Sequence, residues 1–307
     1  MSDSGKAEQA YIGGMVGGTA WFFSREGMAG QLDYLFVDEA GQVSLANLVG
    51  VAPSARNLVL MGDQMQLGQP IQGSHPGESG LSVLEYYLSG HATIPADRGL
   101  FLDVTWRMHP AVCSFISEAV YESRLLSAPH TTNRIVNRPS DVATLINRPA
   151  GLQFVPVEHD GNQQGSDEEV EVIVKLVAEL ALCTLTDEKG DPAGLVNIAK
   201  DILIVAPYNL QVRKLEDALP SGTRVGSVDK FQGQEAPVVI VSMCTSAGEL
   251  GGRGLQFVLD QNRLNVAISR AQSLAIIVGD PRLAQVACGT VGDMCRLNLF
   301  NWIQSVG

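Results

Sequence analysis

Six short apolar runs, separated by longer segments with helical spacing, constrain the fold of this 307-residue chain most strongly. They read LFVDEA, LVLMGD, LQFVPVEH, ILIVAPY, VVIVSM and LAIIVGD, and each leads into a polar or glycine-containing turn. Apolar runs of about four to eight residues that alternate with helical segments are typical of parallel strands covered by helices. We therefore predict an α/β fold, with ligands at the carboxyl ends of its parallel strands.

The length favours two domains, because compact domains usually hold roughly 100 to 200 residues. Hydrophobic residues make up 45% of the chain, enough for a substantial core. Residues 93–99 contain Pro95 and Gly99 and are expected to link two sheets. We predict a first domain over residues 1–97 and a second over residues 98–307.

The composition argues against several classes of protein. The longest apolar runs are far shorter than the ~20 residues that cross a membrane, and the first ten residues lack the features of a secretory signal. The five cysteines form no C-x-x-C pair, which favours reduced thiols in the cytoplasm over a zinc site. The net charge of −12 is unusual for a protein that binds a polyanion, although a cleft can be locally positive. The acidic run at residues 167–171 is expected to be a solvated helix face.

Acidic and amide side chains follow the first two apolar runs. Asp38 and Glu39 come directly after LFV, and Asp63 and Gln66 follow LVLMG. In a nucleotide site the first acid of such a pair holds Mg²⁺ and the second polarises the attacking water. The alternative is an ordinary helix N-terminal turn, where acids are also common.

The order of the motifs resembles that of superfamily 1 helicases, whose second and third motifs read D-E-A and G-D-x-x-Q-L. The matching blocks are GGTAWFF at residues 17–23, TWRMHP at 105–110, VAPYNLQ at 205–211, VGSVDKFQGQE at 225–235 and NRLNVAISRAQ at 262–272. The similarity is greatest to the Upf1/Dna2-like branch, some of whose members are fused to a RecB-like nuclease. It implies two tandem RecA-like domains, the first incomplete at its N-terminus, with ATP between them.

The resemblance also implies roles for individual residues. Asp38 would bind Mg²⁺, Glu39 would activate water, and Asp63 and Gln66 would contact the nucleotide phosphates.

In the second domain, Trp106 would stack on the base of ATP, in place of the family's usual tyrosine. Arg107 and Arg270 would neutralise phosphate charge, with Arg270 on a helix. Glu235 would bind the ribose, and Gly233 would let the backbone approach it. Ordinary core aromatics and surface arginines are the alternative reading of these positions.

Single-stranded DNA or RNA is the implied partner. The candidate contacts are Gly18, Thr19, Tyr208, Asn209, Gln211 and Ser227, whose polar groups would hold phosphates without reading sequence. Trp21 is either a stacking platform or a core residue. We expect His109 to be structural.

One motif that a superfamily 1 motor requires is absent from the sequence. The loop G-x-x-x-x-G-K-[ST], which cradles phosphates, does not occur, and the nearest imitation at residues 4–7 lacks its first glycine and its hydroxyl. Two hypotheses follow. In the first, the chain is a portion of an active motor whose loop lies upstream, as the nuclease does in family members that carry one. In the second, it is a catalytically silent binding module derived from a helicase. The retained acids and arginines favour the first.

Overall fold

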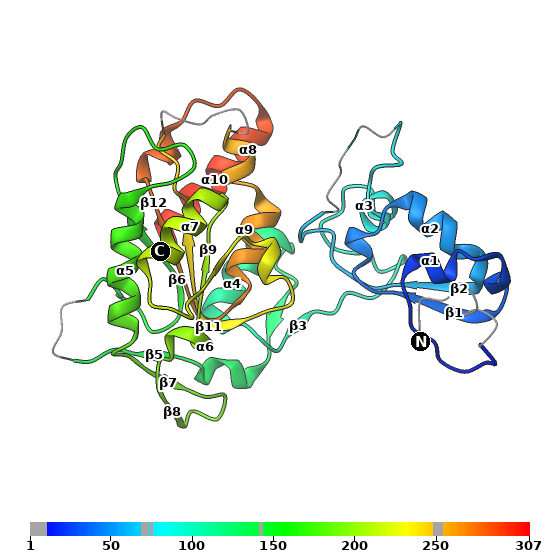
Figure 1. The fold of residues 1–307 in the computed structure, drawn as a ribbon, viewed down its shortest axis with the longest axis horizontal. Coiled ribbons are helices and arrows are strands. Elements are labelled where there is room, and N and C mark those ends of the chain that lie inside the picture. Colours follow the sequence, from blue (N-terminus) through cyan, green and yellow to red (C-terminus); the bar gives the residue numbers. More distant parts are fainter. Residues whose placement is uncertain (1–10, 69–72, 74–75, 141–143, 248–253) are drawn as a thin grey trace. The chain divides into compact units, whose positions relative to one another are not determined.

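The computed structural model describes residues 11–68, 73, 76–140, 144–247 and 254–307. The chain forms two compact units, Met1–Gly99 (unit 1) and Leu100–Gly307 (unit 2), both drawn in Figure 1. The division falls two positions after the expected end of the first domain at residue 97 (99 − 97). All six apolar runs form strands as predicted, so the α/β assignment is confirmed.

Unit 1 contains a two-stranded parallel sheet of β1 (Leu32–Val37) and β2 (Ala55–Leu60), paired from Leu32↔Ala55 to Val37↔Leu60. Its helices are α1 (Ala20–Phe23), α2 (Leu45–Val51) and α3 (Val83–Leu88). Ser82 and Glu85 form a reciprocal capping box that fixes the start of α3. A small apolar cluster packs α2 against β1, with Met28, Leu35 and Val51 among its buried residues.

Two glycines let the turns after β1 and β2 approach each other closely. A Cβ on Gly41 would lie 2.5 Å from the carbonyl oxygen of Asp63, and one on Gly62 would lie 2.7 Å from the nitrogen of Ala40. Gly62 also has a φ of 152°, which side chains rarely adopt. Only glycine therefore fits, and the acidic ends of the two strands are held side by side.

Unit 2 is built on a five-stranded parallel sheet with the order β10-β9-β11-β12-β6. The strands are β6 (Gly151–Pro156), β9 (Ile202–Val205), β10 (Arg224–Gly226), β11 (Ala236–Ser242) and β12 (Ala271–Gly279). β9 is buried at every position and β12 at all but one, as expected for parallel strands covered on both faces.

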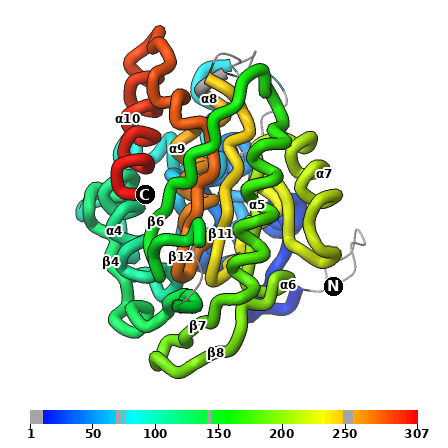
Figure 2. The backbone as a smooth tube through the Cα atoms, turned by 90° about the vertical axis from the view of Figure 1, so that its left-hand side faces the viewer, coloured from blue at the N-terminus to red at the C-terminus, as the bar shows by residue number. Residues whose placement is uncertain are grey.

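Helices cover both faces of this sheet, as Figure 2 shows. One face carries α5 (Asp167–Leu180), α6 (Ile198–Asp201) and α7 (Asn209–Ala218); the other carries α4 (Pro110–Val120), α9 (Gln261–Ile268) and α10 (Val291–Val306). The short helix α8 (Gly254–Val258) precedes α9. The main core lies between the sheet and α5, where Ile173, Leu176 and Ile240 are fully buried.

Two small sheets in unit 2 were not predicted. β3 (Val104–Thr105) pairs with β4 (Leu126–Ser127), and an antiparallel sheet joins β5 (Val136–Asn137), β7 (Thr184–Thr186) and β8 (Pro192–Leu195). These strands have only two to four residues, too few to show a periodic pattern. Among the described residues, no helix is both long and apolar enough to cross a membrane.

We predict that Gly62→Ala destabilises unit 1 by about 1 to 3 kcal/mol, because the new methyl group overlaps the backbone of Ala40. Urea unfolding of the 307-residue chain measures the change. Gly50→Ala is the matched control: Gly50 lies within α2 with nothing near its Cβ position, so alanine there should stabilise by roughly 0.5 to 1 kcal/mol. Equal effects of the two substitutions would contradict the close approach.

Candidate active site

Asp38 and Glu39 emerge directly from β1, and both are exposed. Glu39 has a φ of 51°, a left-handed conformation uncommon for a residue other than glycine, and its N–H donates to Oδ1 of Asp38 at 3.0 Å. Strained backbone of this kind is concentrated at functional sites. The turn after β1 therefore presents two carboxylates to solvent in a fixed orientation.

The carboxylates around this turn suit Mg²⁺ only when water and the phosphates of a ligand complete its coordination. Within the described part of the chain, no group of three or more His, Cys, Asp or Glu side chains could hold a metal ion. Mg²⁺ commonly uses one or two carboxylates together with water and substrate phosphates. The exposed Asp38 carboxylate fits that arrangement and does not fit a site made by protein alone.

The turn after β2 is tied down by its own side chains. Oδ1 of Asp63 accepts from the N–H of Met65 at 2.9 Å, and Oδ2 accepts from Nε2 of Gln66 at 2.9 Å. Gln64 donates to the carbonyls of His91 and Ala92 at 2.9 and 2.6 Å. Asp63 thus orients Gln66, and both lie beside the acidic turn through the glycine contact described above.

In unit 2, Arg107 lies at the centre of a cluster at the amino ends of β11 and β12. Its Nε donates to Oε2 of Glu235 at 2.5 Å, and its Nη1 donates to the carbonyl of Ser269 at 3.3 Å. Gln272 donates to the other oxygen of Glu235 at 2.8 Å. The N–H of His109 donates to the carbonyl of Gln272 at 2.7 Å, so the loop that carries Arg107 is attached to β12.

The electrostatics of this cluster keep Glu235 ionised. Burial raises the pKa of Glu235, but hydrogen bonds from Arg107 and Gln272, together with the charges of Arg107 and Arg134, outweigh burial and lower the pKa below its usual value. Both partners stay partly exposed, with 31% of the Arg107 side chain and 43% of the Glu235 side chain accessible. The pair is therefore open to exchange with a ligand.

Arg270 is placed differently from the expectation. The helix α9 ends at Ile268 and is capped by Ser269, so Arg270 stands in the turn between α9 and β12 and not on a helix. Only 4% of the residue is exposed. Its carbonyl accepts from the N–H of Ala236 at 3.1 Å, which places Arg270 at the start of β11, next to Glu235.

Trp106 lies on the surface beside residues that the sequence did not single out. It is 69% exposed, and its ring lies 5.1 Å from that of His130. Arg134 donates to the carbonyls of Trp106 and Arg107 at 3.1 and 2.9 Å, and to Oε2 of Glu188 at 3.0 Å. No motif marks Arg134, because it acts through backbone atoms that only the fold brings within reach. The exposure of Trp106 rules out the alternative of a core aromatic.

Gly233 follows η6 (Asp229–Phe231) with a φ of 76° and is exposed, a conformation that favours glycine in this turn just before Glu235. His109 caps α4 by accepting from the N–H of Ala111 at 3.1 Å, which confirms its structural role. Burial lowers the pKa of His109 and outweighs the hydrogen bond with the backbone of Thr132, which raises it.

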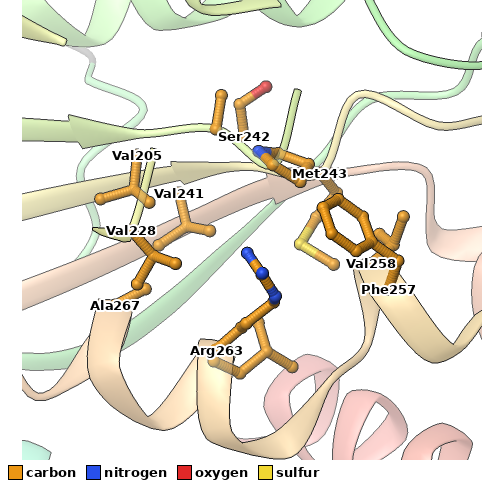
Figure 3. A pocket seen from close by; sticks show the side chains of 12 residues that line it. Val205, Val228, Val241, Ser242, Met243, Phe257, Val258, Arg263 and Ala267 are labelled. Atoms are coloured by element: carbon orange, nitrogen blue, oxygen red, sulfur yellow. The ribbon is translucent and has the colours of Figure 1, made fainter. Parts of the chain in front are cut away.

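The carboxyl edge of the same sheet carries three of the residues that are predicted to bind single-stranded nucleic acid. Tyr208 follows β9 and precedes α7, Asn209 begins α7 and is exposed, and Ser227 follows β10. Beside them, a hollow lies between the ends of β9 and β11 and the helices α8 and α9 (Figure 3). The arginine cluster and these residues thus occupy opposite edges of one sheet.

Gln211 does not fit its predicted role. It is fully buried; its Oε1 accepts from the N–H of Ser166 at 2.8 Å, and its Nε2 donates to Ser242 at 3.0 Å. The structure contradicts a contact between Gln211 and nucleic acid, because both ends of its amide bind elements of the protein. It joins α7 to the start of α5 and to β11.

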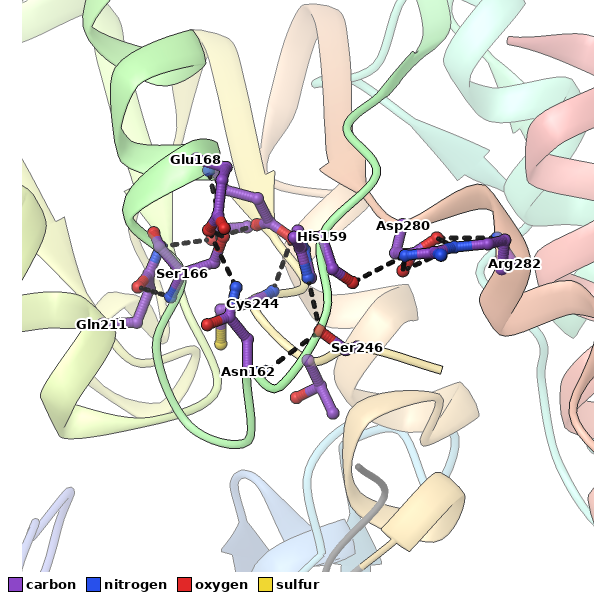
Figure 4. A network of polar contacts seen from close by, with 12 residues as sticks. His159, Asn162, Ser166, Glu168, Gln211, Cys244, Ser246, Asp280 and Arg282 are labelled. Atoms are coloured by element: carbon purple, nitrogen blue, oxygen red, sulfur yellow. Dashed lines mark hydrogen bonds and ion pairs between the residues drawn. The ribbon is translucent and has the colours of Figure 1, made fainter. Parts of the chain in front are cut away.

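Gln211 belongs to a buried polar network at the carboxyl edge, drawn in Figure 4. Glu169 accepts from Nε2 of His159 at 3.0 Å, from the hydroxyl of Ser242 at 2.6 Å and from the N–H of Cys244 at 2.9 Å. Nδ1 of His159 lies 2.8 Å from the hydroxyl of Ser246. Glu169 is fully buried, so the expectation of a solvated face is wrong at this position of the acidic run.

In unit 1, Gly18 and Thr19 are exposed and lead into α1. Trp21 is 82% exposed, which rules out a core position. Its ring is available for stacking.

Comparison with known proteins places these features in a family. The model of a family described as "AAA domain" matches residues 81–282, about two thirds of the chain. The chain belongs to this family. Its motifs are those of the C-terminal motor region of superfamily 1 helicases.

Three relatives illustrate the match. The chain is 30% identical to DNA-binding protein SMUBP-2 of Mesocricetus auratus over 81% of its length and 25% of that protein. It is 30% identical to putative helicase mov-10-B.1 of Danio rerio over 82% of its length and 28% of that protein. It is 28% identical to DNA replication ATP-dependent helicase/nuclease DNA2 of Gallus gallus over 88% of its length and 26% of that protein.

The chain therefore spans about a quarter of the length of these relatives. Among solved structures, an arterivirus nonstructural protein 10 (helicase) aligns over 80% of this chain and 38% of its own, with 19% identity and a TM-score of 0.39.

We predict that His159 makes the stability of unit 2 depend on pH. Burial lowers the pKa of His159, but the hydrogen bond and charge of Glu169, with the charges of Asp280 and Glu168, outweigh burial and raise it above 6.5. A raised pKa in the folded state means that protonation stabilises the fold below pH ~6.5, and that this stabilisation is lost as pH rises through the folded-state pKa.

The measurement is urea unfolding of the wild type and of His159→Gln between about pH 6 and pH 8. The difference in unfolding free energy should shrink as pH rises. His91→Gln, at an exposed histidine, is the control and should give no such trend. If the difference in unfolding free energy between the two proteins stays constant with pH, protonation of His159 does not stabilise the fold as predicted.

Proposed function

We propose that this chain is the motor portion of an ATP-dependent helicase or translocase that moves along single-stranded DNA or RNA. The observation that carries this proposal is the cluster around Arg107. Its partners Glu235 and Ser269 lie 128 and 162 positions away in the sequence, in separate motifs. The fold brings Arg107, Glu235 and the carbonyl of Ser269 together beside the exposed Trp106, from three motifs that are far apart in the sequence.

In this proposal, unit 1 acts on the phosphates and water. Asp38 holds Mg²⁺, which supplies charge neutralisation at the phosphates when it is bound. Glu39 orients and polarises the attacking water, and Gln66, held by Asp63, contacts the terminal phosphate. The fixed turn at Glu39 supports this role, because the carboxylate needs little reorganisation.

Unit 2 supplies recognition and positive charge. Trp106 stacks on the base of ATP, Glu235 accepts from the ribose hydroxyl, and Gly233 allows close approach of the backbone. Arg107 and Arg270 neutralise the charge that develops on the transferred phosphoryl group. Because Glu235 holds Arg107 in this structure, Arg107 reaches a phosphate only after that ion pair exchanges for the nucleotide.

We assign the bound DNA or RNA strand to the carboxyl edge of the unit 2 sheet, opposite the arginine cluster. Tyr208, Asn209 and Ser227 contact it there, and Gly18 and Thr19 contact it in unit 1. Backbone and hydroxyl contacts of this type hold phosphates without reading sequence.

We assign hydrolysis to the longer protein and not to these 307 residues alone. They contain no G-x-x-x-x-G-K-[ST] loop, and without it the phosphates lose the lysine and the backbone amides that bind them. The reduced cysteines are consistent with a cytoplasmic protein. A catalytically silent binding module would instead bind strand with no turnover in the full-length protein.

We predict that Arg270→Ala in the full-length protein lowers strand-stimulated ATP turnover by about 10³-fold or more while nucleotide affinity stays nearly unchanged. Because Arg270 is buried, Glu39→Gln serves as a second variant: its exposed, isosteric amide should leave the fold intact and also abolish most turnover. Arg56→Ala, at an exposed arginine of unit 1, is the matched control.

Turnover is measured with and without single-stranded DNA or RNA. Normal turnover in Glu39→Gln and Arg270→Ala would overturn the assigned roles. A wild-type protein that binds strand and never hydrolyses ATP would establish the silent module.

A further inference from the structure

The hairpin of β7 and β8 brings a carboxylate, that of Glu188, to the loop that carries Trp106. The hairpin lies at one end of unit 2, at the bottom of Figure 2. Its turn is formed by Asp187, whose Oδ1 accepts from the N–H groups of Asp191 and Lys189 at 2.9 and 2.8 Å. Aspartate commonly closes a turn in this way, through bonds to its own backbone. The position of Glu188 within the turn is therefore well defined.

Hydrogen bonds attach this turn to the segment that leads into β5. Nδ2 of Asn133 donates to the carbonyl of Glu188 at 2.8 Å. On β7, the hydroxyl of Thr186 donates to the carbonyl of Asn133 at 2.5 Å, and its N–H donates to the carbonyl of Ile135 at 3.1 Å. Arg134 lies between these two partners in the sequence, so the hairpin is fixed beside Arg134.

Glu188 contacts two side chains that both hold Trp106. Its Oε2 accepts from Nη2 of Arg134 at 3.0 Å and lies 3.9 Å from Nε2 of His130. Arg134 uses Nη1 to donate to the carbonyl of Trp106 at 3.1 Å. The His130 ring lies 5.1 Å from the Trp106 ring, with 37° between the ring planes. One carboxylate oxygen thus orients both the group that binds the backbone of Trp106 and the group that packs on its ring.

The exposure of these side chains fits a supporting role. Only 18% of the Arg134 side chain and 28% of the His130 side chain are accessible, whereas Trp106 is 69% exposed. Trp106 therefore keeps surface for a ligand, while the groups that support it are largely covered. Ordering an exposed side chain in advance lowers the entropy cost of binding to it.

The neighbouring Arg107 has attachments that do not involve Glu188. Arg134 donates to its carbonyl, but its side chain also binds Glu235 and a carbonyl just beyond α9. Loss of the Glu188 carboxylate would therefore release Trp106 and leave the Arg107 guanidinium beside Glu235. Because the two residues of this loop differ in what supports them, recognition of the base is separable from neutralisation of phosphate charge.

We propose that Glu188 is a positioning residue for nucleotide binding, which acts through Arg134 and His130 to hold Trp106 in the orientation that stacks on the base. The inference rests on the proposed nucleotide site and adds to it a residue that lies outside the motifs. Because Glu188 acts through Trp106, its effect on nucleotide binding must vanish when the indole is absent.

The test measures kcat and the KM for ATP of the full-length protein in the presence of single-stranded DNA or RNA. We expect Glu188→Ala to raise KM about 3- to 10-fold, the range of a lost aromatic contact, and to leave kcat within about twofold. Glu188→Gln keeps an oxygen that accepts from Arg134, so it should raise KM less. Asp191→Ala, at an exposed carboxylate of the same turn, is the matched control and should change neither.

Trp106→Ala decides whether Glu188 acts through the indole. In the Trp106→Ala background, Glu188→Ala should raise KM no further, because the two substitutions remove the same contact. A variant that only damages the fold of the hairpin would add its effect to that of Trp106→Ala. Circular dichroism establishes that each variant is folded.

The failure of the proposed function and that of the positioning role give different results. A full-length wild type that hydrolyses no ATP overturns the proposed function, and the role of Glu188 with it. If the wild type turns over ATP, three results overturn the positioning role alone. They are an unchanged KM in Glu188→Ala, a loss confined to kcat, and effects of Glu188→Ala and Trp106→Ala that simply add.

Discussion

The burial of the five-stranded parallel sheet of unit 2 on both faces is the constraint on which the rest of this unit depends. Parallel strands with helices on both sides have no exposed face on which to carry polar chemistry. The predicted site residues of unit 2 that stay exposed therefore lie at the two edges where strands begin and end. The arginine cluster at the amino edge and the hollow at the carboxyl edge are consequences of that arrangement.

One short helix connects the two edges. Near its N-terminal end, α9 carries Arg263, which contacts Asp229 and the ring of Phe257. Beyond its C-terminal end, Ser269 accepts from Arg107. A helix of eight residues is rigid over roughly 12 Å, at 1.5 Å per residue. The helix α9 therefore connects a residue of the arginine cluster to a residue that lines the hollow.

A buried polar network connects the elements at the carboxyl edge of the unit 2 sheet. Glu169 accepts from His159, Ser242 and the backbone of Cys244, and Gln211 donates to the same Ser242 hydroxyl, which avoids the cost of an isolated buried charge. In unit 1, two glycines play the corresponding part, because they allow the acidic turns to touch where any side chain would separate them. Both features fix the backbone next to predicted site residues.

The sequence by itself determined the six strands, the α/β class and the membership of the motif set, because apolar runs and short motifs are local properties of the chain. It also determined which acids and arginines are candidates for chemistry. Tertiary structure alone decided their surroundings. Arg107 pairs with Glu235, Arg270 lies in a turn, and Gln211 and Glu169 are buried, since each depends on contacts between segments far apart in the chain. Arg134 became visible only through the backbone carbonyls it holds, and the hollow beside Phe257 exists only where β9, β11, α8 and α9 meet.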